Sequence, residues 1–94
     1  MTFYLNIVSI EKQLFSGLVK KINIKGSEGD LSIFSKHTPL LTTIKSGIIN
    51  IITEYDKKKS IYLFNGILEV QFNIVTILTN VINKTYLDIK NNIN

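Results

Sequence analysis

The feature that most constrains this chain is an alternation of apolar and polar side chains with a period of two. Near the start, Phe3, Leu5 and Ile7 alternate with less apolar neighbours, and Ile22 and Ile24 alternate with lysine and asparagine. A strand with one buried face has this period, whereas an amphipathic helix repeats its apolar residues every three or four positions. Helical spacing is hard to find in the sequence, so the pattern predicts strands.

Turn signals separate further predicted strands, which cover residues 48–55, 61–64, 67–72 and 74–79. The first two flank a charged turn at 56–59, which predicts a hairpin. Asn65 and Gly66 tolerate positive φ and mark a turn or bulge, and Asn73 marks a short turn. Short strands at this spacing predict an all-β fold, a small antiparallel β-sandwich of about eight to ten short strands with a short C-terminal tail.

Length and composition limit the class of protein. Ninety-four residues suffice for one domain with a modest core. We assign residues 1–84 to this domain and 85–94 to a short tail. No apolar run approaches the roughly 18 residues that cross a bilayer, and no basic-then-apolar leader opens the chain, so we expect a soluble protein that is not exported. The lack of cysteine excludes disulfides and thiolate chemistry.

The positive charge is interpreted as compositional. The net charge is +4, all eleven basic residues are lysine, and the chain holds seventeen isoleucines and ten asparagines. This combination is typical of a coding sequence rich in A and T. Arginine, whose planar fork suits phosphates and base edges, is absent. We therefore interpret most lysines as a solvated surface.

Residues 25–47 depart most from the rest of the chain. They hold three of the five glycines, the only proline, the only histidine and two acids, Glu28 and Asp30. The glycines flank carboxylates, which would repel the phosphates that a P-loop binds. A triad of Ser35, His37 and Asp30 lacks the glycines of a nucleophile elbow, and one histidine with scattered acids is too few for zinc. We predict no catalytic, cofactor or metal site, and interpret the segment as a contact loop.

Four separated segments resemble one protein family. The run GSEGDLSIFSKHTPLLTTIKSGII resembles the epsilon subunit of F-type ATP synthases of the bacterial type. LNIVSIEKQLFSGLVKKI before it, and YLFNGILEV and VTILTNV after it, follow the same order and spacing. Together these segments run from about Phe3 to Val81, which is nearly the whole chain.

The resemblance implies a non-catalytic rotor subunit without a cofactor. Subunits of this kind have a β-sandwich at the foot of the central stalk that joins the gamma subunit to the membrane c-ring. Proton flow is thereby coupled to ATP synthesis on the alpha and beta subunits. The resemblance also implies a peripheral location on the cytoplasmic face of the bacterial inner membrane. The positions that match c-ring contacts are Glu28, Gly29 and Asp30, and those that match gamma contacts are Ser9, His37 and Thr42.

Within the loop, this chain departs from the family pattern at several positions. Ser32, Ser35 and Lys36 stand where Gly, Pro and Gly are common, which leaves the approach to His37 less constrained. Asn65 stands where a second glycine is usual, and asparagine tolerates a left-handed conformation better than most residues.

The end of the sequence departs further, and the resemblance implies that the tail 85–94 is a remnant of a C-terminal helical domain. Family members usually continue into a two-helix domain that inhibits ATP hydrolysis and in some members binds ATP through a motif of Leu or Ile, Asp and then Arg. Leu87 and Asp88 resemble that opening, but Lys90 and asparagines follow. We therefore expect no ATP site and no helix-mediated inhibition. Thr85 is an N-cap candidate for at most one loose turn, because the remaining segment is too short for a stable helix.

A small β-barrel that binds single-stranded nucleic acid is the alternative. Such proteins stack bases on aromatic side chains while a basic groove follows the backbone, and residues 57–59 beside Tyr55 and Tyr62 supply these residue types. A solvated hairpin tip accounts for the same residues, and Phe3 and Phe72 fall in apolar stretches that indicate core positions. We therefore expect no nucleic-acid partner.

Overall fold

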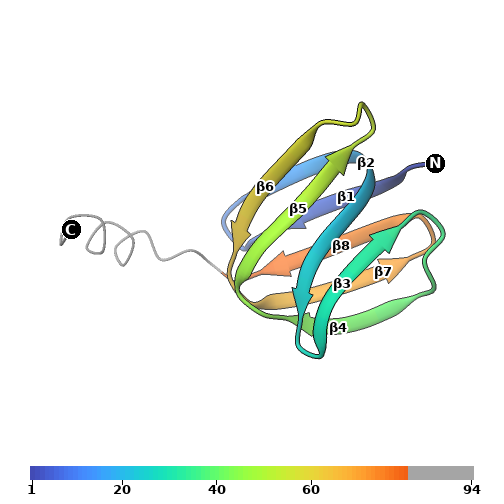
Figure 1. Cartoon of the computed structure of the whole chain (residues 1–94). Helices are drawn as coiled ribbons and strands as arrows, with labels where there is room; N and C mark the ends of the chain where they lie inside the picture. The colour runs from blue at the N-terminus through green and yellow to red at the C-terminus, as the bar shows by residue number, and fades with distance from the viewer. Residues whose placement is uncertain (81–94) are drawn as a thin grey trace.

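The computed structural model describes residues 1–80, and within them it contains eight strands and no helix (Figure 1). No helix in this part of the chain is long and apolar enough to cross a membrane. The predictions for Thr85, Leu87, Asp88 and the tail 85–94 lie outside the described residues. The strands are β1 Phe3–Val8, β2 Gln13–Gly26, β3 Gly29–Phe34, β4 Leu40–Ile44, β5 Gly47–Thr53, β6 Lys58–Leu63, β7 Gly66–Gln71 and β8 Ile74–Thr79.

All eight strands belong to one hydrogen-bonded sheet that folds over into two layers. Their order is β1-β8-β7-β4-β2-β5-β6, with β3 beside β2 and an additional β1–β2 pair. In Figure 1, β1, β8, β7 and β4 form one layer and β3, β2, β5 and β6 form the other. The small all-β sandwich is therefore confirmed. Its strand pairs are antiparallel except for β1 and β8, which run parallel.

A bulge at Lys20 allows β2 to pair with strands of both layers. The first half of β2 pairs with β1, and the second half pairs with β3 and β5. Val19 pairs with Thr53 and Lys21 pairs with Ile52, so Lys20 is an extra residue between two rungs. A bulge bends and twists its strand. Val19 and Ile22 consequently both face the core, although regular alternation would place them on opposite faces.

The core consists of the inward side chains of both layers. Phe3, Leu5 and Ile7 are at most 1 % exposed, and Ile22 and Ile24 are also buried, which confirms the alternation. They belong to a single cluster of buried apolar residues. Full burial of one such side chain is worth about 1.5–3 kcal/mol, so this cluster is the main source of stability.

Two local predictions were wrong because the strand ends were misplaced. The charged turn expected at 56–59 lies at 54–57, since Lys58 and Lys59 already pair with β5. Phe72 was expected in the core, but β7 ends at Gln71 and Phe72 lies in the β7–β8 turn, where it is 80 % exposed. Asn73 in the same turn has a φ of 58°, as its turn signal predicted.

Asn65 and Gly66 connect the two layers, and neither has positive φ. The strand before them, β6, pairs with β5, whereas β7 after them pairs with β4 and β8. Position 66 must be glycine because there is no room for a side chain. A Cβ there would lie 2.0 Å from the Leu78 carbonyl oxygen and 2.8 Å from the Thr79 Cα. The glycine therefore sets how closely β7 and β8 approach.

Candidate functional site

The two acids of the 25–47 segment project from the tip of the β2–β3 hairpin. The strands pair as far as Gly26 and Gly29, which leaves Ser27 and Glu28 as the turn. Gly29 has a φ of +128°, a conformation that favours glycine. Glu28, Gly29 and Asp30 are all exposed. The three residues predicted to contact the c-ring therefore share one projecting surface, which we call the acidic tip (Glu28, Gly29 and Asp30).

A shallow cavity of about 200 Å³ joins the acidic tip to β4. Residues 26–31 line one side, and Leu40 and Thr42 line the other. Thr42 is half-buried between Leu40 and Ile44 on the inward row of β4, and its hydroxyl donates to the Thr43 carbonyl oxygen at 3.4 Å. The structure thus brings Thr42 close to the acidic tip.

Ser9 and His37 lie at different ends of the β1-β8-β7-β4 layer. Ser9 follows β1 in a tight turn, where its backbone N–H donates to the Lys12 carbonyl oxygen at 2.9 Å. His37 precedes β4 and its Nδ1 is 2.7 Å from the Thr38 carbonyl oxygen. β8 and β7 separate β1 from β4, which corresponds to roughly 14 Å at one strand spacing per step. Ser9, His37 and Thr42 do not form a cluster.

The described residues do not assemble a catalytic or metal constellation. The Ser35 hydroxyl donates to Asn73 Oδ1 at 3.5 Å, and His37 contacts a backbone carbonyl, so the two side chains have different partners. Between residues 1 and 80, no three acidic or histidine side chains meet to hold a metal ion.

The outer side of the β1-β8-β7-β4 layer exposes apolar side chains, and the sequence pattern did not predict this surface. Val8, Leu78 and Ile67 pair in register across three strands, and Leu78 and Ile67 are each 45 % exposed. A parallel row pairs Tyr4 with Ile74. The sequence sign of this surface was that β8 has apolar residues at both its inward and its outward positions. A strand that is covered on both faces shows no alternation of apolar and polar residues. We call this surface the apolar face, and it consists of Tyr4, Val8, Leu18, Leu41, Ile67, Ile74 and Leu78.

The apolar face also lacks lysine. None of the four strands of this layer, β1, β4, β7 and β8, contains a lysine. Within the described strands, all lysines lie in β2 and β6. Compositional bias explains the number of lysines but not this distribution. Exposed apolar residues that gather in rows on one side of a sheet mark an interaction site, and here the rows flank a central polar row of Asn6, Thr76 and Glu69.

The outer side of the β3-β2-β5-β6 layer has a polar central row, and the rows on either side of it include the exposed residues Phe34, Ile48 and Tyr62. Ser32, Asn23, Asn50 and Ser60 pair in register across four strands. The Ser32 hydroxyl donates to Asn23 Oδ1 at 3.2 Å, and the Ser60 hydroxyl donates to Asn50 Oδ1 at 2.8 Å. The neighbouring row holds two lysines on either side of an isoleucine. We call this surface the polar face, and it consists of Lys21, Asn23, Lys25, Ser32, Asn50, Ile52, Lys58 and Ser60.

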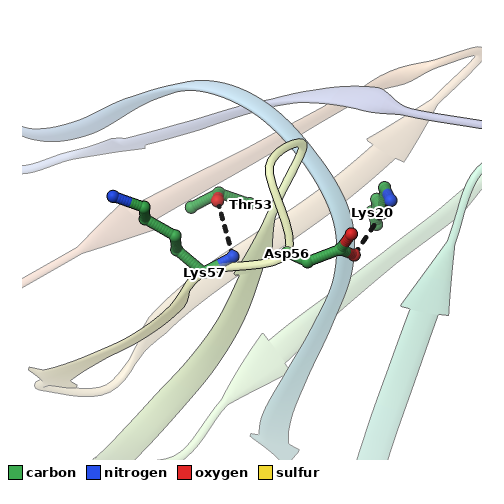
Figure 2. A network of polar contacts seen from close by, with 4 residues as sticks. All are labelled: Lys20, Thr53, Asp56 and Lys57. Atoms are coloured by element: carbon green, nitrogen blue, oxygen red, sulfur yellow. Dashed lines mark hydrogen bonds and ion pairs between the residues drawn. The ribbon is translucent and has the colours of Figure 1, made fainter.

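The β5–β6 turn lies at the opposite end of the sandwich from the acidic tip (Figure 1). Figure 2 shows the Lys20 ammonium 2.9 Å from the Asp56 carboxylate and the Lys57 backbone N–H donating to the Thr53 hydroxyl at 3.2 Å. Asp56 has a φ of 61°. The ion pair therefore ties the turn to the bulge of β2.

The lysines and tyrosines around this turn do not form one stacking platform. Tyr55 lies in the turn, whereas Tyr62 lies near the other end of β6 and contacts Phe64 edge-on with ring centroids 5.7 Å apart. Lys58 belongs to the polar face, but the Lys59 ammonium lies 5.5 Å from the Phe15 ring centroid on the other side of the strand. Alternation along β6 thus places Lys59 on the opposite side of the strand from Lys58 and Tyr62, so the lysines and tyrosines around this turn do not share one face.

Comparison with known proteins gives one family and two similar solved structures. The profile of the family described as ATP synthase, Delta/Epsilon chain, beta-sandwich domain matches residues 2–85. A chain of the Euglena gracilis mitochondrial ATP synthase, from a structure of OSCP, F1 and the c-ring in rotational state 1, is 20 % identical with a TM-score of 0.80, covering 95 % of this chain and 61 % of that chain.

A chain from a structure of the Tetrahymena thermophila mitochondrial ATP synthase central stalk and c-ring is 19 % identical. Its TM-score is 0.68, and the match covers 83 % of this chain and 63 % of that chain. At such identities, the likeness to both structures shows the fold. The present chain spans about three fifths of the length of each solved chain.

Proposed function

The chain belongs to the family of ATP synthase delta/epsilon chain β-sandwich domains, and from this we propose that it is a non-catalytic rotor subunit of the central stalk. In this role it joins the gamma subunit to the c-ring and acts on the alpha and beta subunits through the assembled complex. It lies peripherally at the membrane, on the cytoplasmic face of a bacterial inner membrane. The two similar structures, one with F1 and the c-ring and one with the central stalk and c-ring, support this proposal.

The observation that carries the proposal is the lysine-free apolar face. A stable protein joint buries about 800 Å² on each partner, and exposed ion pairs contribute only about 0–1 kcal/mol each. A firm contact must therefore rest mainly on apolar area. The apolar face supplies that area on one side of the sandwich, and we assign it to the gamma subunit.

The residues predicted to contact gamma belong to the layer that carries the apolar face, with Ser9 and His37 at its ends and Thr42 on the inward row of β4. Ser9 follows Val8 at the end of β1, and His37 precedes β4 at the other end of the layer. Thr42 lies on β4, the strand of this layer farthest from β1 along the sheet. We propose that Ser9 and His37 contact gamma at the rim of the interface, where polar groups are usual. We propose that Thr42 contacts gamma from the cavity beside β4.

The acidic tip is proposed to contact the polar loops of the c-ring. Glu28 and Asp30 offer two exposed carboxylates to basic side chains, and Gly29 lets the turn approach closely. Each ion pair at such a surface is weak, so the tip fixes orientation more than affinity.

Coupling in this scheme requires a rigid connection between the two contacts and no chemistry by the subunit itself. β2 provides such a connection: its second half ends at the acidic tip, and its first half pairs with β1 under the apolar face. Rotation of the ring, driven by proton flow, reaches gamma through this strand and the sheet around it.

Calorimetric titration of the chain with its cognate gamma subunit at two salt concentrations tests the proposal. We expect saturable one-to-one binding in the nanomolar to micromolar range that changes little with salt, because apolar contact dominates. A folded chain that forms no complex with gamma would contradict the proposed role. Binding that weakens steeply with salt would contradict the assignment of the apolar face.

A further inference from the structure

We propose that the polar face carries a binding site for a phosphate-type oxyanion, a function beyond the proposed stalk role. A cavity of about 280 Å³ lies on the outer side of β2, β5 and β6. It is large enough for a phosphate group with some of its water, given about 30 Å³ for each water molecule. Its polar lining comprises Lys21, Asn23, Asn50, Lys58, Lys59 and Ser60.

Two lysines give the cavity a positive charge, and the carboxylate of Asp30 lines the adjoining pocket that shares Asn23 and Asn50. Lys21 and Lys58 both pair with Ile52, one from each neighbouring strand, so the two side chains flank the same isoleucine on the outer surface. No carboxylate lines this cavity within the part of the chain that the structure describes. Asp56 is bonded to Lys20 at 2.9 Å, outside the lining. The Lys21 ammonium lies 5.3 Å from the Phe34 ring centroid, and a bound anion would offer it a charged partner in place of the ring.

The two asparagines direct hydrogen-bond donors toward the same cavity. The amide oxygen of Asn23 accepts from Ser32, and that of Asn50 accepts from Ser60. Each amide nitrogen is left as a donor, and among the described residues no acceptor is bonded to either nitrogen. Asn23 and Asn50 are directly paired, so their side chains are neighbours on one face of the sheet.

These donors define the class of ligand. A group of ammonium and amide N–H donors suits a ligand that only accepts hydrogen bonds and carries negative charge. A phosphate monoester or inorganic phosphate has both properties. The phosphate can come from a free anion or from the headgroup of an anionic lipid. With two exposed lysines we expect a dissociation constant on the order of millimolar.

Titration of the folded chain with inorganic phosphate at constant ionic strength, followed by amide NMR, tests the proposal. We expect saturable shifts confined to residues 21–23, 50–52 and 58–60. The double variant K21Q/K58Q should bind at least about fivefold more weakly. The matched double variant K12Q/K45Q, which removes two exposed lysines elsewhere, should bind like the parent chain.

A single substitution in the cavity lining tests the role of the amide donor. Asn50→Asp keeps an acceptor for Ser60 but replaces the amide donor with a carboxylate, so phosphate binding should be lost. Equal weakening in both lysine double variants, or shifts spread over all lysines, would show diffuse attraction and overturn the proposal. Unchanged binding by Asn50→Asp would overturn it as well.

Vesicles separate the two sources of phosphate. We compare neutral phosphatidylcholine vesicles with vesicles that also contain anionic phosphatidylglycerol. Shifts at the same residues with anionic vesicles support a lipid headgroup, and shifts with inorganic phosphate alone support a free anion. Neither response at these residues overturns the site. Gamma binding by K21Q/K58Q should equal that of the parent chain, so failure of this proposal leaves the stalk role intact.

Discussion

The two outer faces of the sandwich differ although the strands beneath them share one inward pattern. On β8, Val75 and Ile77 face the core while Ile74 and Leu78 form part of the apolar face. On β5, Ile49 and Ile51 face the core while Asn50 lies in the polar face. Because a strand sends alternate residues to opposite sides, inward positions specify the fold and outward positions specify the partner. The two sets of positions therefore change independently.

Gly66→Ala should have the largest effect on stability, because it disturbs the layer that carries the apolar face and changes no residue of the other layer. The new Cβ would lie 2.0 Å from the Leu78 carbonyl oxygen, so backbone atoms must move. We expect a loss of at least about 3 kcal/mol in the free energy of unfolding, measured by urea denaturation. Gly17→Ala is the matched control, since its nearest contact is 3.8 Å, and it should change stability by less than about 1 kcal/mol. Equal effects would refute the steric argument.

Ile67→Ser with Leu78→Ser tests the assignment of the apolar face directly. Removing two exposed apolar side chains from the proposed interface should weaken gamma binding at least about tenfold in calorimetry. Ile48→Ser removes an equally exposed isoleucine from the other layer and should change affinity less than about twofold. Both variants should keep the parent urea midpoint within about 1 kcal/mol, because the altered residues are exposed. Similar losses of affinity from both layers would contradict the assignment.

Lys36→Gly tests whether the connection between the two layers contains a strained residue. Lys36 lies between β3 of one layer and β4 of the other, with a φ of 64°. A left-handed conformation costs a side-chain residue about 1–2 kcal/mol, partly offset by the entropy that glycine loses on folding. We expect a gain of about 0.5–1 kcal/mol in urea denaturation. Lys45→Gly, at a position without positive φ, should show no gain.

Asp56→Asn should have the smallest effect. The change removes the ion pair with Lys20 and keeps a residue that tolerates a φ of 61°. The side chains of Lys20 and Asp56 are 39 % and 73 % exposed, so solvent screens the pair and we expect a loss below about 0.5 kcal/mol. The difference from the parent should vanish at high salt. A loss above about 1 kcal/mol would show a structural role for the pair.

The sequence predicted those parts of the fold that depend on local pattern. Alternation identified the buried sides of β1 and β2, and turn signals located the β5–β6 and β7–β8 hairpins. The parallel β1–β8 pair and the bulge at Lys20 were not predictable, because pairing between distant segments sets them. Phe72 was misplaced because alternation does not show where a strand ends.

The candidate site was predictable to a smaller extent. The acids Glu28 and Asp30 between glycines indicated an exposed turn, and the structure places them at a hairpin tip. The polar face joins residues from four strands, so it appears only when the registers are known. The apolar face depends on the same registers, although the adjacent apolar pairs Ile74-Val75 and Ile77-Leu78 in β8 were a local sign of it.

Among the strands of residues 1–80, β6 ends the order and has β5 as its hydrogen-bonded neighbour, so none of these strands pairs with its other edge. Open edges allow strands of separate molecules to pair and to grow into aggregates. Lys58 and Lys59 lie on this edge, and lysine is a residue by which natural proteins discourage such pairing. The lysines of β6 thus disfavour self-association of the chain by edge-to-edge pairing.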